Sequence, residues 1–109
     1  MTKIALIARL RAKPGRRADL LDALDELVSA MGRESGTLVY LLHTDDADED
    51  SVWFYELYAN AAALEEHRTS DTMRRMKPRF GELLAEPIDI VTGELVDGKI
   101  SAEPTMRPT

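Results

Sequence analysis

Two neighbouring segments of the chain, residues 36–44 and 52–59, alternate as β-strands do but carry large apolar or aromatic side chains at both parities. At even-numbered positions these side chains are Leu38, Tyr40, Leu42, Phe54 and Tyr58. At odd-numbered positions they are Val39, Leu41, Trp53, Tyr55 and Leu57. A sheet with two apolar faces in one small domain needs two covers. Helices can supply one cover, and we expect a second copy of the same sheet to supply the other.

The remaining periodicity predicts the other elements of a single α+β domain. These are strands over residues 3–13 and 88–96, and helices over residues 16–31, 61–67 and from 70 onward. Asn60 is placed to cap the second helix, and Pro78 should kink or split the third. The resulting order βαββαβ is that of a ferredoxin-like fold with an antiparallel sheet.

Chain length and composition limit the class of protein. The 109 residues suffice for one domain, which we place at residues 1–97, and we expect residues 98–109 to form a mobile tail. The absence of cysteine excludes a disulfide framework, a thiolate metal site and a cysteine nucleophile. No segment resembles a signal peptide or approaches the ~20 apolar residues of a membrane span, so we expect a cytoplasmic protein without a membrane partner.

Charge argues against a nucleic-acid partner, because 20 acidic and 14 basic side chains give a net charge of -6. Arg68, Arg75 and Arg79 would share one helix face, which is either solvated or holds an anionic ligand. The acidic run 45–50 has the early spacing of a calcium loop but lacks its glycine and its final glutamate, and we interpret it as a solvated hairpin turn. The two distant histidines predict no metal site.

The order of features between Glu34 and Phe80 is more specific than any single motif. A strand that contains Val39-Tyr40 is followed by the acidic turn, an aromatic strand and a helix that carries His67. This arrangement resembles the antibiotic biosynthesis monooxygenase family of cofactor-free oxygenases. The resemblance implies a dimeric α/β barrel, a homodimer joined through the open face of the sheet. It also implies a cofactor-independent monooxygenase that oxidises an electron-rich phenol, anthrone or quinol with dioxygen, and a small aromatic substrate as its ligand.

The same resemblance suggests site residues. A histidine at the position of His67 often faces a pocket between helix and sheet in this family, where it would act as base or hydrogen-bond anchor. Glu56 is a carboxylate on an apolar strand and needs a partner, for which His67 or an arginine is the natural candidate. Glu56 would then orient His67, although a purely structural hydrogen bond is the alternative.

Aromatic side chains are candidates for substrate contacts, and we name Tyr58, Trp53 and Tyr40. Packing in the core or at the dimer seam is the alternative for each of them. His43, at the end of its strand, fits a structural or surface role, the seam, or a pocket mouth.

Two rival functions stay open. One is a non-catalytic small-molecule-binding or interaction dimer of the same fold. The other is a haem-degrading protein of a different branch of this fold, which typically relies on an asparagine, with tryptophan and histidine, around the porphyrin. This function is disfavoured because the single asparagine here, Asn60, lies at a helix start and not on the first strand.

Overall fold

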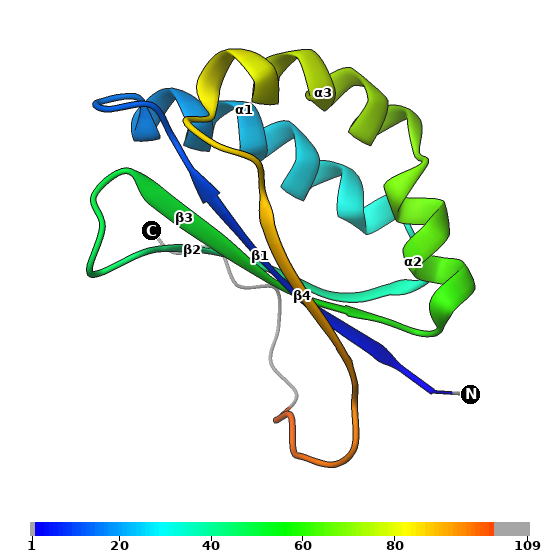
Figure 1. Cartoon of the computed structure of the whole chain (residues 1–109). Coiled ribbons are helices and arrows are strands. Elements are labelled where there is room, and N and C mark those ends of the chain that lie inside the picture. The colour runs from blue at the N-terminus through cyan, green and yellow to red at the C-terminus, as the bar shows by residue number, and fades with distance from the viewer. Residues whose placement is uncertain (1, 102–109) are drawn as a thin grey trace.

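The computed structural model describes residues 2–101 and shows a four-stranded antiparallel sheet with helices on one face (Figure 1). The elements are β1 (Ile4–Arg11), α1 (Arg17–Ala30), a 3-10 turn η1 (Met31–Arg33), β2 (Thr37–Thr44), β3 (Ser51–Tyr58), α2 (Ala61–Arg68), α3 (Asp71–Leu83) and β4 (Asp89–Glu94). The strand order is β2-β3-β1-β4, with β3 and β1 in the centre. The predicted α+β ferredoxin-like fold is therefore confirmed.

The core lies between the helices and one face of the sheet. On α1 the buried positions Leu20, Leu24 and Leu27 recur at helical spacing, so they form one stripe against the strands. On β1 the side chains of Leu6 and Leu10 are buried on the same side as that stripe. Each such side chain contributes about 1.5–3 kcal/mol through burial, which makes this layer the main source of stability.

Side-chain caps position α2 and α3. The Asn60 side chain accepts a 2.9 Å hydrogen bond from the backbone N–H of Ala63, as the sequence predicted, and Ser70 caps α3. The predicted split at Pro78 is wrong, because α3 runs through this residue without interruption. Pro78 cannot bond to the carbonyl of Arg74, but both residues are exposed, so water can satisfy that carbonyl.

An irregularity in β2 changes one predicted face. Thr37 pairs with Tyr58 and Val39 pairs with Leu57, so Leu38 is an extra residue in the ladder and is 46% exposed. The predicted placement of Leu38 on the same face as Tyr40 is therefore wrong. From Val39 onward the alternation follows the prediction.

The second face of the sheet carries no helix (Figure 1). Register places Ile7, Leu41 and Val91 on this face, at exposures of 45%, 37% and 64%. We call it the open face. Both faces are apolar, as predicted, and among residues 2–101 only one of them is covered.

The chain after β3 differs in small ways from its prediction. β4 ends at Glu94, two residues earlier than expected, and residues 97–101 form neither helix nor strand. Residues 102–109 of the predicted tail lie outside the described residues. Within residues 2–101 no helix has the length and apolar character needed to cross a membrane.

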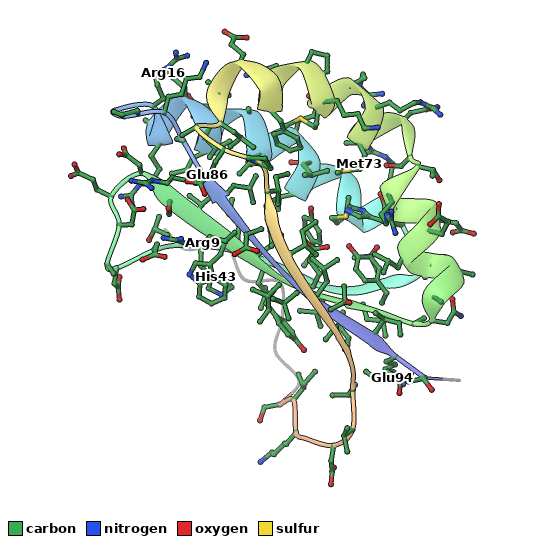
Figure 2. All side chains as sticks on the ribbon, in the orientation of Figure 1. Arg9, Arg16, His43, Met73, Glu86 and Glu94 are labelled. Carbon is green, nitrogen blue, oxygen red and sulfur yellow. The ribbon has the colours of Figure 1, made fainter. Side chains whose placement is uncertain are left out.

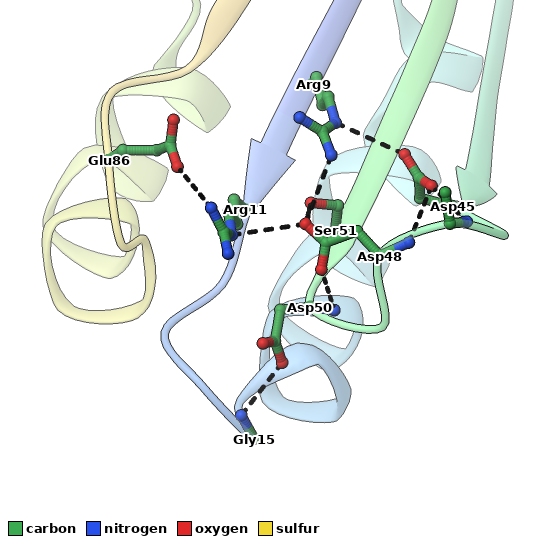
Figure 3. Close-up of polar contacts among 9 residues, drawn as sticks. Arg9, Arg11, Gly15, Asp45, Asp48, Asp50, Ser51 and Glu86 are labelled. Atoms are coloured by element: carbon green, nitrogen blue, oxygen red, sulfur yellow. Dashed lines mark hydrogen bonds and ion pairs between the residues drawn. The ribbon is translucent and has the colours of Figure 1, made fainter.

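The acidic run forms the turn between β2 and β3, as predicted, and it also fastens this turn to β1 (Figure 3). Asp48 accepts hydrogen bonds from the Asp50 backbone N–H at 3.0 Å and the Ser51 hydroxyl at 2.8 Å, and these bonds hold the pKa of Asp48 below its ordinary value. Arg9 and Arg11 of β1 form ion pairs with the same carboxylate at 3.3 and 3.4 Å. The carboxylates of Asp45, Asp48 and Asp50 within this run therefore have protein partners.

Gly36 generates the first prediction. A Cβ at this position would lie 2.5 Å from the Cβ of Ala63 on α2, so Gly36→Ala must push α2 away from the sheet. We expect the free energy of unfolding to fall by about 1–3 kcal/mol, the usual cost of overpacking. Urea denaturation measures the change.

Gly81→Ala on α3 is the matched control, because nothing lies within 4 Å of its added Cβ and alanine favours helix. The control should be as stable as the wild type or more stable. Equal stability of Gly36→Ala and wild type would contradict the close packing of α2 on β2.

Candidate functional site

A cavity of about 300 Å³ lies between the helices and the covered face of the sheet. Its walls are almost entirely apolar: Leu6, Ala8, Leu10, Leu27, Phe54, Leu64, Met73, Phe80, Ile88 and Ile90. Its polar lining consists of Tyr40, Glu56, His67, Arg68 and Thr92. In Figure 2, Met73 marks the helix side of the sheet, where this cavity lies, and His43 lies on the opposite side. A largely apolar pocket with few convergent polar groups is the usual form of a small-molecule site.

His67 is the most firmly held polar side chain of the cavity. It lies near the end of α2, is 4% exposed, and donates from Nδ1 to Oε1 of Glu34 at 2.9 Å. Its ring is also in tilted contact with the rings of Tyr40 and Tyr58, each at a centroid distance of 5.4 Å. The ring therefore has little freedom to turn.

The predicted pair between Glu56 and His67 is wrong. The carboxylate that His67 binds is Glu34, whereas Glu56 accepts a hydrogen bond from the hydroxyl of Tyr58. Glu56 and Tyr58 are two residues apart on β3, so their side chains lie next to each other on the same face. Glu34 precedes His67 by 33 residues, and no local spacing in the sequence announces the contact.

Burial sets the protonation of the polar groups. It raises the pKa of Glu56 to about 7, an effect that the Tyr58 hydrogen bond opposes and the charge of Glu34 reinforces. Burial, with the nearby carboxylates Glu56 and Glu34, also raises the pKa of Tyr40 above its ordinary value. Near neutral pH, Tyr40 is thus a neutral phenol, and Glu56 can accept or donate a proton.

Three polar atoms of these residues are available to a ligand. Among residues 2–101 we find no hydrogen-bond partner in the protein for His67 Nε2, the Tyr40 hydroxyl or the second carboxyl oxygen of Glu56. In the same part of the chain, every side-chain nitrogen or oxygen that is buried from solvent has a hydrogen-bond partner. The three atoms are therefore accessible to solvent, and their residues all line the cavity.

The aromatic predictions divide by face. Tyr40 lines the cavity, whereas Tyr58 is fully buried behind the lining residues Glu56 and His67, both of which it contacts. Trp53 is on the open face, stacked on His43 with ring centroids 3.8 Å apart and planes 6° apart. Of the three aromatic residues predicted to contact a substrate, Tyr40 therefore lines this cavity, whereas Tyr58 and Trp53 do not.

Thr92 lines the cavity but was not anticipated as a site residue, whereas Arg68 belongs to the basic face for which the sequence left an anionic ligand open. Thr92 is part of the lining because β4 pairs with β1, which places Thr92 opposite Leu6. Only the order of the strands in the sheet could have predicted this position. Arg68 lines the cavity and pairs weakly with Glu65 at 3.8 Å, whereas Arg75 binds Glu26 of α1 at 3.3 Å. The predicted basic face is thus partly paired with carboxylates.

No group of three or more histidine or carboxylate side chains within residues 2–101 could hold a metal ion. The polar end of the cavity instead offers one imidazole, one carboxyl and one phenol. These groups can exchange a proton with a hydroxyl group and donate hydrogen bonds to an oxyanion.

Comparison with known proteins agrees with the fold and identifies the family. The family model for antibiotic biosynthesis monooxygenases matches residues 3–79. The chain belongs to this family. The match includes β1 to β3, α2 and most of α3, and therefore most of the cavity.

Individual relatives support the same family. Rv0793 of Mycobacterium tuberculosis, whose name describes a candidate monooxygenase, is 32% identical over 87 residues, which are 80% of this chain and 85% of that protein. Its structure superposes with a TM-score of 0.81, covering 88% of this chain and 97% of that one at 28% identity. A Caulobacter crescentus protein, described as a candidate antibiotic biosynthesis monooxygenase, gives 0.81 at 27% identity over 88% and 92% of the chains.

The relatives do not name a substrate. A Nitrosomonas europaea protein of unknown function superposes with a TM-score of 0.82 at 29% identity, covering 94% of this chain and 98% of that one. Membership of the family supports a monooxygenase-like role, and the finer assignment depends on this chain's own residues.

Glu56 generates the second prediction. Its pKa of about 7 in the folded protein lies above its ordinary value of 4.5, so between these pH values the folded state holds the proton more tightly than the unfolded state. The contribution of Glu56 to stability must therefore fall as pH rises through this window. Glu56→Gln cannot titrate and lacks this dependence.

We expect the free energy of unfolding of the wild type, minus that of Glu56→Gln, to decrease by up to about 3 kcal/mol between pH 4.5 and 7.5. Denaturant titrations across this range measure the difference, in which the titration of other groups largely cancels. A difference that stays constant with pH would contradict a carboxyl buried in this way.

Proposed function

We propose that this protein is a cofactor-independent monooxygenase that oxidises an electron-rich phenol, anthrone or hydroquinone with dioxygen. The observation that carries the proposal is the cavity itself, in which reachable atoms of His67, Glu56 and Tyr40 converge at one end of an apolar space. An aromatic ring fits the apolar walls, and its hydroxyl group fits the polar end. Family membership supports the reaction class.

The chemistry needs a proton acceptor more than it needs a redox group. Nε2 of His67 takes the proton of the substrate hydroxyl, and the resulting phenolate is oxidised by dioxygen, forming a carbon–oxygen bond to a peroxide. The O–O bond then breaks to leave a carbonyl on the ring carbon. The departing oxygen leaves as water, with one proton returned from His67 and one from that ring carbon.

The other cavity residues assist this sequence. The neutral Tyr40 hydroxyl and the protonated form of Glu56 can donate hydrogen bonds to the phenolate oxygen as its charge develops. The apolar walls exclude water, which strengthens these interactions and protects the peroxide. The volume of about 300 Å³ is at the small end for ligand sites, which suits a compact aromatic ring system.

Oxygen uptake with a panel of hydroquinones, naphthols and anthrones tests the function. His67→Ala should lower the rate about 100-fold for any substrate that the wild type oxidises, because it removes the proton acceptor. His43→Ala is the matched control, since His43 is the other histidine and lies on the open face.

Uptake that His67→Ala leaves unchanged would remove His67 from the mechanism. If the wild type consumes no oxygen with any member of the panel but binds one of them in a calorimeter, a non-catalytic binding role replaces the enzymatic one.

We also propose that the protein is a homodimer in which a second copy covers the open face. This face is apolar at Ile7, Leu41 and Val91, all more than a third exposed, and its half-buried Trp53 and Tyr55 extend it. Exposed apolar surface of this kind, contiguous across all four strands, is typical of an interface. A copy of the same face supplies a matching apolar surface through two-fold symmetry.

Sedimentation velocity tests the dimer. The wild type should sediment as a dimer at micromolar concentration, and Leu41→Lys combined with Val91→Lys should shift it to a monomer, because the two charges would be buried at the seam. Ala62→Lys, on the exposed side of α2, is the control and should remain dimeric. A monomeric wild type would contradict the proposal.

A further inference from the structure

Glu34 is hydrogen-bonded to His67 but has no role in the reaction proposed above. It lies between the turn η1 and β2, and its side chain is 22% exposed. One of its oxygens, Oε1, accepts two hydrogen bonds, from His67 Nδ1 at 2.9 Å and from the Thr37 hydroxyl at 3.0 Å. Thr37 therefore fixes the carboxylate in the direction of the imidazole.

This contact determines which nitrogen of His67 carries the proton. A carboxylate can only accept, so Nδ1 must donate and must hold a hydrogen. In the neutral ring Nε2 is then unprotonated, and it is the nitrogen without a protein partner among residues 2–101. The ring contacts with Tyr40 and Tyr58 oppose a flip that would exchange the two nitrogens.

We propose that Glu34 is the positioning carboxylate of the site, which holds His67 in the Nδ1–H form and stabilises the imidazolium that forms when Nε2 takes a substrate proton. The role in the reaction rests on the proposed function, whereas the tautomer does not. Glu34 does not line the cavity proposed to hold the substrate, and the proton transfer does not pass through it. The transferred proton moves from the substrate oxygen to Nε2 and later to the departing peroxide oxygen.

A second cavity, of about 220 Å³, reaches Glu34 from the side away from the first. It is lined by Arg33, Glu34, Ser35, Gly36, Thr37, Ala63, Glu66 and Ser70. Glu34 does not line the first cavity, and His67 does not line the second, so the pair lies between the two spaces. If the Glu34 side chain is shortened, a small carboxylate can enter from this second cavity and take its place.

The tautomer is tested without any substrate. In protein labelled with ¹⁵N-histidine at pH 8, the His67 ring should show a protonated Nδ1 and an unprotonated Nε2. The signals of His67 are assigned with His43→Gln, which leaves a single histidine. In Glu34→Leu, which cannot accept a hydrogen bond, the Nδ1–H signature should be lost. A wild-type His67 with its proton on Nε2 would overturn the proposal.

The catalytic role is tested by substitution and rescue. With any substrate from the panel, Glu34→Ala should lower kcat about 100-fold and change KM by less than about 2-fold, because ring orientation and imidazolium stabilisation act on the chemical step. Formate or acetate at millimolar concentration should restore activity in a saturable manner. Glu66→Ala, which alters the second cavity without touching His67, is the control and should retain full activity.

The outcomes separate the two proposals. Activity of Glu34→Ala equal to that of the wild type, or a loss that neither formate nor acetate relieves, would overturn the positioning role. If neither the wild type nor any variant turns over a substrate, while wild-type His67 shows the Nδ1–H signature, the proposed reaction is wrong. The assignment of the His67 tautomer to Glu34 would still hold.

Discussion

The pairing of β3 with β1 on one side and β2 on the other decides where each side chain of the site lies. Because this strand is hydrogen-bonded on both edges, a slip of one residue would move its whole set of side chains to the opposite face. The observed register turns Phe54, Glu56 and Tyr58 toward the helices and leaves Trp53 on the open face. The cavity, its carboxyl group and the apolar open face all follow from this one arrangement.

The covered face is unusual because it contains polar groups inside an apolar layer. An unpaired carboxylate there would cost several kcal/mol, yet Glu56 and His67 each have a hydrogen bond that offsets part of the cost of burial. Tyr58 donates to Glu56, and Glu34 accepts from His67. Since each bond uses only one atom of Glu56 and one of His67, both residues retain a second atom for a ligand. The arrangement therefore combines a stable core with a reactive cavity.

Much of the fold could be predicted because its signals are local. Alternation identified the strands, helical spacing identified α1 and α3, and Asn60 identified the start of α2. The split predicted at Pro78 does not occur because Arg74 and Pro78 lie on the exposed side of α3, where water can replace the lost hydrogen bond. The extra residue at Leu38 has no local signature, since its neighbours alternate normally.

The candidate site could be predicted only in part. Parity along β3 already separated Trp53 from Glu56, so the sequence itself argued against a slot that contains both. The partner of His67 could not be found in this way, because Glu34 and His67 meet only when η1, β2 and α2 have packed together. Spacing arguments describe neighbours within one element, whereas this pair depends on three.

The central claim is that an aromatic ligand binds between the helices and the sheet, next to His67, and not on the open face. The most direct measurement is an NMR titration of ¹⁵N-labelled protein with a hydroquinone, in which the indole N–H of Trp53, the single tryptophan, reports on the open face. Our account predicts shifts at His67, Thr92 and other cavity residues, with the Trp53 indole signal unmoved. Shifts centred on Trp53 and His43, with the cavity residues silent, would contradict it.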